Sequence, residues 1–359
     1  MKLQVIDVSN PLWSETLQNL RHDFYHVPGY VALEAKRMRA IAEAILIQDG
    51  EKVFFLPYLL RQCDDIFDED LKASEIFDVS SPYGYPGILL NDAGAEDLEF
   101  IHLTMAQLIQ TFKDRRICSA FLRLHPIFNH YFDEIYYSQI CTIHSETIAI
   151  DLKLTEVEIW RQTRPEHRNK INKCKRSGFV ARIVPWNQYF HDFIDIYTET
   201  MKRVGASKSY YFSHEYFWHL VEALKEGVHL CIVELDHQVV CAGLFTEYCG
   251  IVQYHLGGTR NDFLKSSPTT LMFDYVRLWA KERGNEILHL GGGVGGAKDS
   301  LYRFKAGFSQ QRYNFSLVRL IADEENYNYL VNLRAKQLNT QVEQLLKTEF
   351  FPVYRSISV

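Results

Sequence analysis

The sequence predicts an α/β or α+β fold made of two similar units. Short apolar runs of strand length alternate with longer segments of helical periodicity along the 359 residues. Glycine, proline and asparagine or aspartate mark the boundaries between these segments. One order of elements, in which a hairpin is followed by a strand with a loop, a helix and a strand, occurs twice. Two copies of one α/β unit are the simplest account of this order.

The first copy begins with a hairpin over residues 41–61, where two apolar runs flank Asp49 and Gly50. A loop of turn-forming residues follows at 78–87. We then expect a helix around 95–113 and a strand at 120–124. These elements form a first unit over residues 1–152.

The second copy falls within residues 153–359. It comprises a hairpin at 229–247 that turns near Asp236, a strand at 251–257, a loop at 257–262, a helix at 268–282 and a strand at 286–290. For the helix, Ser267 is the predicted N-cap, Pro268 the first helical residue and Gly284 the stop. A further helix is predicted at 323–348, near the C-terminal end of this unit.

A basic helical connector, residues 155–178, precedes the second copy. Thr155 with Glu158 and Thr163 with Glu166 both have capping-box spacing, so we expect two short helices, the second starting near Pro165. Gly178 ends the second helix.

Composition limits the function classes. The chain carries 47% hydrophobic and 23% charged residues with a net charge of −6, which is typical of a soluble globular protein and argues against a DNA-coating role. Its seven cysteines are odd in number and lack metal-ligand spacing, so we expect reduced thiols and no metal. Neither a signal peptide nor a membrane-spanning run is visible, which predicts a cytoplasmic protein.

Five glycines occur among residues 291–296, and three of them satisfy G-x-G-x-x-G. A dinucleotide-binding loop should lie in a first strand–turn–helix unit and be followed by an acidic residue about 20 positions later. This loop lies in the last third of the chain and lacks that acid. A phosphate-binding P-loop is excluded as well, because Ala297 separates Gly296 from Lys298. What remains is a loop whose backbone N–H groups can approach a ligand closely, or a flexible connection.

The segment after the glycines concentrates charge. Lys298, Asp299, Arg303 and Lys305 occur within eight residues, together with Tyr302. A solvated helix face is the usual explanation of such a pattern. The alternative is that Phe304 and Phe308 anchor the segment in a core, which would fix Lys305 beside the glycine loop. A fixed cation can polarise an acyl carbonyl or hold a phosphate.

The connector offers a second basic feature. Seven cations fall within 16 residues, and three of them, Arg161, Arg168 and Lys175, recur every seven residues. This stripe indicates an anionic partner such as a phosphate, tRNA or a lipid head group, or else a solvated face. Tyr254 is a further candidate, because it lies in a strand that ends at two glycines.

Several stretches, taken in order, resemble the FemABX-like branch of the GNAT superfamily, which comprises tandem GNAT-fold acyl- and aminoacyltransferases. The resemblance runs from about residue 20 to 355. The stretches are LPYLLR at 56–61, SPYGYPG at 81–87, the basic segment 164–178, YTETMKR at 197–203, YHLGGT at 254–259, the glycine segment with FKAGF at 304–308, and FFPVYR at 350–355.

The resemblance implies two tandem GNAT-like units, each a mixed, mostly antiparallel sheet flanked by helices, which face each other across a cleft. It places Lys305 at the acceptor site, Ser81, Tyr83 and Tyr85 in a loop of the first unit, and Arg61 at a strand end. The implied activity is amide formation on an amine of a cell-envelope precursor, as in peptidoglycan bridge synthesis, or of a polysaccharide precursor. No cofactor is resident: the acyl donor is either aminoacyl-tRNA or acyl-CoA.

Two departures from related proteins leave the donor open. The long helical arm of staphylococcal-type members, thought to engage tRNA, has no room between residues 154 and 178. The R/Q-x-x-G-x-G/A pyrophosphate loop of CoA-dependent members is also missing, since residues 263–270 read FLKSSPTT. Ser266, Ser267 and Thr269 at the start of the 268–282 helix remain candidate anion-binding residues.

Our working hypothesis assigns a role to each candidate. Lys305 polarises the acceptor or the developing oxyanion, Tyr254 or Tyr302 protonates the leaving atom, and Asp299 orients Lys305 or Arg303. Phosphates of donor or acceptor are held by basic residues, namely Arg161, Arg164, Arg168, Lys175 and Arg303. The expected acceptor is a small-molecule or lipid-linked amine, with peripheral contact to the inner membrane face. The alternatives are a CoA-dependent N-acetyltransferase and a non-catalytic protein that binds anionic lipid or RNA.

Overall fold

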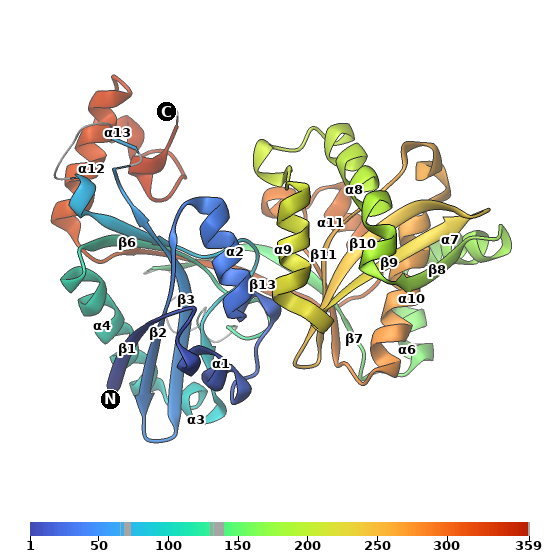
Figure 1. Ribbon diagram of the computed structural model, residues 1–359, viewed down its shortest axis with the longest axis horizontal. Coiled ribbons are helices and arrows are strands. Elements are labelled where there is room, and N and C mark those ends of the chain that lie inside the picture. Colours follow the sequence, from blue (N-terminus) through green and yellow to red (C-terminus); the bar gives the residue numbers. More distant parts are fainter. Residues whose placement is uncertain (65, 68–72, 130–131, 133–139, 358–359) are drawn as a thin grey trace. The chain divides into compact units, whose positions relative to one another are not determined.

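The computed structural model describes residues 1–64, 66–67, 73–129, 132 and 140–357. The chain divides into two compact units (Figure 1). Unit 1 consists of Met1–His144 and Phe315–Val359, and unit 2 of Ser145–Asn314. Strand β7 (Cys141–Asp151) carries the chain from unit 1 into unit 2, and strand β13 (Arg312–Ile321) carries it back.

The predicted division at 152/153 therefore needs a correction at the C-terminal end. Residues from 315 onward pack with unit 1 instead of completing the second unit. The physical reason is strand pairing: β13 runs antiparallel to β6 (Ile117–Arg123), with Leu320 opposite Ala120. The helix that follows β13 then packs on the core of unit 1.

Unit 1 is built on a mixed sheet with the strand order β1-β2-β3-β4-β6-β13. The strands not yet given are β1 (Lys2–Asp7), β2 (Ile41–Asp49), β3 (Lys52–Gln62), β4 (Phe77–Ser80) and the short β5 (Leu89–Leu90), which pairs with β3. The predicted hairpin is confirmed: β2 and β3 are antiparallel, and Gly50 takes the positive φ of 59° that the tight turn requires.

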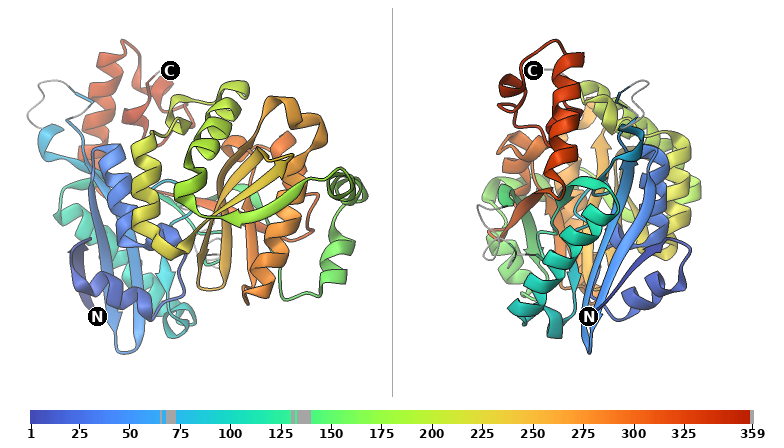
Figure 2. Two further views of the ribbon diagram at one scale, coloured as in Figure 1. Left: turned by 45° about the vertical axis from the view of Figure 1, so that its right-hand side comes forward. Right: turned by 90° about the vertical axis from the view of Figure 1, so that its left-hand side faces the viewer.

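Alternating side chains of β2 and β3 supply two cores, one on each face of this sheet. Ile45, Phe54 and Leu56 pack with α4 (Leu98–Asp114). Ala44, Leu46 and Phe55 pack with α1 (Pro11–Gln18) and α2 (Pro28–Met38) on the opposite face. Figure 2 shows these helices on either side of the sheet. The short helix α3 (Asp92–Ala95) leads into α4.

The C-terminal helix predicted at 323–348 is interrupted. Helix α12 (Glu324–Gln337) ends where Asn339 adopts a left-handed φ of 51°, and only one further turn, α13 (Val342–Leu345), follows. Tyr327 and Leu330 of α12 are buried in a separate cluster of unit 1 together with Tyr354.

Unit 2 has the strand order β7-β12-β11-β10-β9-β8. Its remaining strands are β8 (Val180–Val184), β9 (Val228–Leu235), β10 (Gln238–Tyr248), β11 (Ile251–Thr259) and β12 (Ile287–Gly291). The predicted hairpin is confirmed as the β9–β10 pair, and β11 runs parallel to β12 because a helix crosses over between them.

Helices cover both faces of the unit 2 sheet (Figure 1). They are α6 (Glu156–Gln162), α7 (Pro165–Arg176), α8 (Trp186–Arg203), α9 (His214–Leu224), α10 (Pro268–Glu282) and α11 (Ser300–Lys305). The main core lies under α7, α10 and α11, where Ile171, Phe273 and Phe308 meet the strands. The α8 face requires Gly258, because a Cβ there would lie 2.3 Å from the Thr200 hydroxyl of α8.

Two predicted helix caps differ in the structure. Thr155 and Glu158 form the expected capping box. The second predicted box, Thr163 with Glu166, does not form, because α7 begins after Arg164 without any side-chain cap. Ser267 precedes α10 in a left-handed conformation, with φ 54°, and its side chain does not cap the helix. Both hydroxyls instead donate to carbonyl oxygens of preceding residues, that of Thr163 to Ile159 and that of Ser267 to Leu264.

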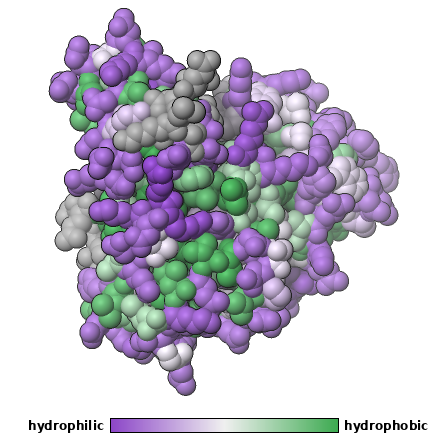
Figure 3. All heavy atoms as spheres, turned by 60° about the vertical axis from the view of Figure 1, so that its left-hand side comes forward, coloured by the Kyte–Doolittle hydropathy of each residue, from purple (hydrophilic) through white to green (hydrophobic). Residues whose placement is uncertain are grey.

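The surface is ordinary for a globular chain. The face drawn in Figure 3 is mostly hydrophilic, with apolar side chains in patches between polar ones. Within the described residues, every helix is too short or too polar to pass through a lipid bilayer.

Candidate active site around the glycine loop

The glycine segment forms a tight turn between β12 and α11. Gly291, Gly295 and Gly296 have positive φ values of 74°, 59° and 83°. A Cβ on Gly293 would lie 2.0 Å from the Ala297 carbonyl oxygen, so this position admits no side chain. The loop is thus a rigidly specified strand-to-helix connection.

Asp299 fixes the start of α11. Its Oδ1 accepts a hydrogen bond from the Tyr302 N–H at 2.8 Å, and its Oδ2 accepts one from the Val294 N–H at 3.2 Å. Within the described part of the chain Asp299 makes no ion pair with Arg303, whose side chain is exposed. The expected direct orientation of Arg303 is therefore wrong: Asp299 caps the helix and joins it to the glycine loop.

Lys305 lies at the end of α11 and is buried, with 6% of its surface exposed. Its Nζ donates to the carbonyl oxygen of Gly292 at 2.7 Å and lies 5.7 Å from the centre of the Tyr254 ring. Burial lowers the pKa of Lys305 to about 8, while the charge of Asp299 acts in the opposite direction. The solvated-face interpretation thus fails for this residue.

Packing explains why Lys305 is held there. Phe304 and Phe308 contact each other and Phe273 of α10, which agrees with the anchored alternative for this segment. Gly307 leaves room for His167 of α7, because a Cβ at Gly307 would lie 2.5 Å from the His167 Nε2. The same Nε2 donates to the Phe304 carbonyl oxygen at 2.8 Å.

Tyr254 is half-buried and packs against aromatic rings next to Lys305. Its ring contacts Phe273 and Phe245, with centroid separations of 4.9 and 5.3 Å. Burial raises the pKa of Tyr254 well above its usual value, so the phenol keeps its proton at neutral pH.

Tyr302 points to a different partner. Its hydroxyl donates to Glu146 Oε2 at 2.8 Å, and Lys298 Nζ lies 2.7 Å from the same oxygen. These two bonds, that of Lys298 first, lower the pKa of Glu146. Glu146 lies in β7, far from the glycine loop in sequence, so no local pattern pointed to it.

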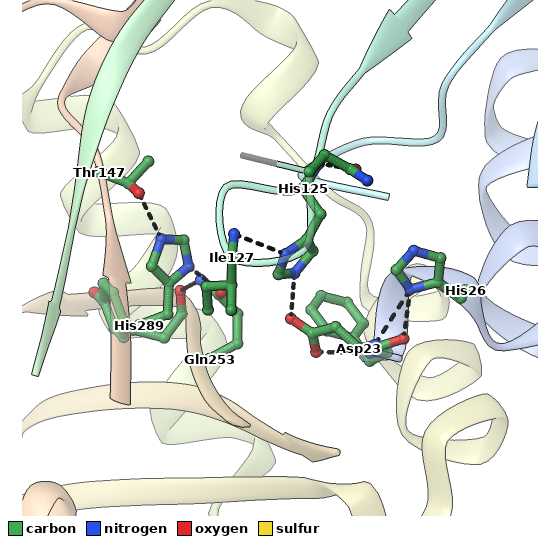
Figure 4. A network of polar contacts seen from close by, with 10 residues as sticks. Asp23, His26, His125, Ile127, Thr147, Gln253 and His289 are labelled. Atoms are coloured by element: carbon green, nitrogen blue, oxygen red, sulfur yellow. Dashed lines mark hydrogen bonds and ion pairs between the residues drawn. The ribbon is translucent and has the colours of Figure 1, made fainter. Parts of the chain in front are cut away.

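The next residue of β7 joins a fully buried polar network in unit 2 (Figure 4). The Thr147 hydroxyl lies 2.8 Å from His289 Nε2, and His289 Nδ1 faces Gln253 Oε1. Gln253 in turn donates to the Tyr254 carbonyl oxygen at 2.9 Å. The network ties β7, β11 and β12 together just before the glycine loop; sequence analysis missed it.

The proposed anion-binding residues at the start of α10 are engaged within the protein. The Ser266 carbonyl oxygen accepts a bond from Cys174, and the Ser267 hydroxyl donates to the Leu264 carbonyl oxygen at 3.5 Å. The Thr269 hydroxyl lies 2.8 Å from that of Thr259. The hydroxyls of Ser267 and Thr269 are thus engaged within the protein, whereas Ser266 is contacted only at its backbone.

The basic stripe does not follow a single helix. Arg161 belongs to α6, whereas Arg168 and Lys175 belong to α7, and the chain breaks between these helices. Lys175 Nζ is paired with the buried Asp274 at 2.7 Å, so its role is structural. Arg161 is exposed, and Arg164 donates to the Arg303 carbonyl oxygen at 3.1 Å. Arg164, the residue between α6 and α7, thus reaches the helix that carries Lys305.

In unit 1, Arg61 is part of a buried charge cluster. Its Nε donates to Asp78 Oδ1 at 2.8 Å, and Asp78, which is fully buried, also accepts from the Tyr354 hydroxyl at 3.0 Å and from Arg355. A guanidinium held in this way supports the fold. This arrangement argues against the predicted role of Arg61 in substrate binding.

The loop of unit 1 that carries the other candidates is also closely packed. The Ser81 hydroxyl accepts from the Arg123 N–H at 2.9 Å. The Tyr83 N–H donates to Glu34 Oε2 at 3.2 Å, and the Tyr85 ring contacts Phe315 at 4.9 Å between centroids. Ser81 is buried, whereas the two tyrosines are half-buried and remain candidates for substrate contact.

Close to this loop, unit 1 buries an Asp–His pair that no sequence pattern indicated (Figure 4). His125 Nδ1 accepts from the Ile127 N–H at 3.2 Å, so His125 Nε2 carries the proton and donates to Asp23 Oδ2 at 3.2 Å. Burial raises the pKa of Asp23 to about 7 and lowers the pKa of His125 to about 3. The pair adjoins Tyr25, against which Gly84 packs.

Potential metal ligands are dispersed. Among the described residues, no group of three or more His, Cys, Asp or Glu side chains lies close enough to hold a metal ion.

The family comparison concerns mainly unit 2. A family model described as an acetyltransferase (GNAT) domain matches residues 161–306. This range contains the glycine loop, α11 and Lys305. A comparison with curated proteins finds no match to the sequence.

Solved structures extend the likeness to both units. FemX matches with a TM-score of 0.69 at 12% identity, over 92% of this chain and 99% of FemX. L-PGS from Bacillus licheniformis matches with a TM-score of 0.54 at 11% identity, over 94% and 98% of the two chains. The C-terminal domain of a candidate lysylphosphatidylglycerol synthetase from Agrobacterium fabrum has a TM-score of 0.54 at 10% identity, over 86% and 90%. The protein therefore shares the fold of FemX across both units, and its second unit contains the segment that matches the GNAT domain.

Proposed function

We propose that this protein is an acyltransferase that forms an amide on a primary amine of a cell-envelope or polysaccharide precursor. The observation that carries the proposal is the position of Lys305 in a GNAT-type unit. Its buried ammonium has a backbone carbonyl as hydrogen-bond partner and lies at the end of a glycine loop. Buried titratable groups of this kind are typical of functional sites.

The reaction that fits this site is attack of the amine nitrogen on an activated acyl carbonyl. A C–N bond forms, the bond from carbon to the leaving oxygen or sulfur breaks, and the proton lost by the amine ends on the leaving group. The Lys305 ammonium would stabilise the negative charge on the carbonyl oxygen in the transition state. Tyr254 is the better proton donor of the two tyrosines, because the Tyr302 proton is directed to Glu146.

Aminoacyl-tRNA is the donor we favour. Arg164 presents positive charge beside α11 and Arg161 is exposed on α6, and RNA phosphates are the natural partners of such basic side chains. The fold shared with FemX and with a candidate lysylphosphatidylglycerol synthetase supports an aminoacyl donor and a lipid-linked acceptor, met in the cytoplasm at the inner membrane face.

An acyl-CoA donor is the second candidate, and the match to an acetyltransferase domain favours it. The internal bond between Thr269 and Thr259 weighs against it, because it occupies a hydroxyl at the helix start where a pyrophosphate would bind.

The test is product formation with each donor. The protein is incubated with an amine-bearing envelope precursor and either a pool of aminoacyl-tRNAs or acetyl-CoA, and amide products are identified by mass spectrometry. We expect an aminoacylated product that requires Lys305. An acetylated product alone would select the second candidate. Salt-sensitive binding of RNA or anionic vesicles without any product from either donor would favour a non-catalytic binding protein.

A further inference from the structure

One ammonium group of the protein occupies a small site next to the glycine loop. Lys298 Nζ lies 2.7 Å from Glu146 Oε2 and 5.7 Å from the centre of the Tyr302 ring. The Tyr302 hydroxyl donates to the same carboxylate oxygen at 2.8 Å. A carboxylate and an aromatic face together are the two features that recognise an alkylammonium ion.

The host side chains are fixed, whereas the occupant is not. Tyr302 is buried in the core of unit 2, and Glu146, which lies in β7, is one-third exposed. The Lys298 side chain is 65% exposed and extends from the glycine loop. An exposed ion pair of this kind contributes about 0.2–1 kcal/mol, so another ammonium could displace Lys298 at little cost.

The site adjoins the buried lysine. A Cβ on Gly292 would lie 3.0 Å from the Glu146 carbonyl oxygen, and the Gly292 carbonyl oxygen is the group that accepts from Lys305. Tyr302 and Lys305 are three residues apart on α11, which places them on the same side of the helix. An amine bound at Glu146 would therefore start close to the proposed site of acyl transfer.

We propose that Glu146 and Tyr302 bind the primary ammonium group of the acceptor, and that Lys298 fills this site until the acceptor displaces it. The inference rests on the proposed function and names its acceptor class: an unbranched primary aminoalkyl group, as at the end of a lysine side chain. The charges that face Glu146 are those of Lys298 and Arg312. A second ammonium must replace Lys298, because adding it would leave the site with excess positive charge.

The binding test does not depend on catalysis. Titration of n-butylamine, with n-butanol as the uncharged control, is followed by NMR on the wild type, Lys298→Ala and the double variant Lys298→Ala/Glu146→Gln. We expect Lys298→Ala to bind the amine about two- to fivefold more tightly than the wild type, since the competing pair is gone. The double variant should bind at least tenfold more weakly than Lys298→Ala, because a charged hydrogen bond is lost.

Equal affinity of the wild type and Lys298→Ala, or retained affinity in the double variant, would overturn the proposal. Thermal melting of each variant checks that it is folded. With an active donor, Lys298→Ala should raise kcat/KM for the amine and Glu146→Gln should raise KM. If no amine is acylated but n-butylamine binds as expected, the proposed function fails and the ammonium site stands.

Discussion

Each unit buries a charge, and the two charges are treated differently. In unit 1, Asp78 is completely enclosed and accepts hydrogen bonds from Arg61, Tyr354 and Arg355. In unit 2, Lys305 is almost as buried, but its hydrogen-bond partner is the Gly292 carbonyl oxygen, which carries no full charge. A fully paired charge holds a fold together, whereas a sparsely paired one costs stability and keeps its reactivity.

The largest expected loss of folding stability comes from removing the paired charge, Asp78. Asp78→Ala leaves two guanidinium groups without their carboxylate, and breaking such a buried pair costs about 3–5 kcal/mol. Denaturant unfolding should show this loss. Glu75→Gln is the control, because its pair with Arg116 is exposed at both ends and should contribute nothing measurable. Similar small losses for both variants would remove the contrast between the units.

Removing the sparsely paired charge, Lys305, should instead increase folding stability. The lowering of the Lys305 pKa from 10.5 to about 8 corresponds to roughly 3 kcal/mol of destabilisation at neutral pH, at about 1.4 kcal/mol for each pH unit. Lys305→Met leaves the Gly292 carbonyl without a donor, which costs about 1–2 kcal/mol. The net expectation is a gain of about 1–2 kcal/mol at pH 7.

The stability difference between Lys305→Met and the wild type should depend on pH. Between pH 8 and 10.5 the unfolded chain still binds the Lys305 proton and the folded chain has released it, so this group makes the wild type more stable as pH rises through that window. The Lys305→Met variant lacks the contribution, and its advantage should shrink toward pH 10.5. An advantage that is constant from pH 7 to 10.5 would show that Lys305 is not titrating in this range.

A smaller effect is expected from the packing that fixes Lys305. Gly307→Ala forces a methyl group against the His167 ring, which should cost about 1–3 kcal/mol. Gly295→Ala is the matched control, since a Cβ there meets nothing within 4 Å and the cost is that of its φ of 59° alone, about 1–2 kcal/mol. Thermal denaturation measures the stability cost of each variant. Only Gly307→Ala should also reduce acyl transfer. Equal behaviour would mean that His167 can move aside.

The smallest net contribution to the pH dependence of the wild type comes from the Asp–His pair of unit 1. Asp23, with its pKa raised from 3.8 to about 7, makes the folded state bind an extra proton, so its contribution falls as pH rises from 4 to 7. His125, with its pKa lowered from 6.5 to about 3, has the opposite slope from pH 3 to 6.5, and the two nearly cancel. Asp23→Asn should therefore add a rise in stability of up to about 1.4 kcal/mol for each pH unit between pH 4 and 6.5. An unchanged slope in urea titrations would contradict these assignments.

The sequence predicted what depends on local pattern. Periodicity and turn chemistry predicted the two hairpins, the α10 helix with its proline start and the glycine turn. They also offered the anchoring of Lys305 by Phe304 and Phe308 as one of two interpretations. The connector was correctly predicted as two helices. The basic stripe, however, was counted across the break between them, so Arg161 in α6 does not share a helix face with Arg168 and Lys175 in α7. The Thr163 cap failed because Arg164 is the N-cap of α7 and the Thr163 hydroxyl donates to the Ile159 carbonyl oxygen.

What escaped prediction depends on partners distant in sequence. Glu146 reaches Tyr302 across 156 positions, and His125 reaches Asp23 across 102. The family resemblance implied that Arg61 is a substrate ligand, and its buried partner Asp78 lies in another strand. The return of residues 315–359 to unit 1 is likewise a matter of strand pairing that no local signal records.

The most direct test of the central claim compares turnover of Lys305→Met with that of Lys281→Met. Lys281 also donates to backbone carbonyls, those of Leu152 and Leu154, but lies at the end of α10 away from the glycine loop. With a donor and amine that the wild type joins, we expect Lys305→Met to lose about 10²–10³-fold in kcat/KM while remaining folded. Lys281→Met should keep its turnover. Undiminished acyl transfer by a folded Lys305→Met variant would contradict the account.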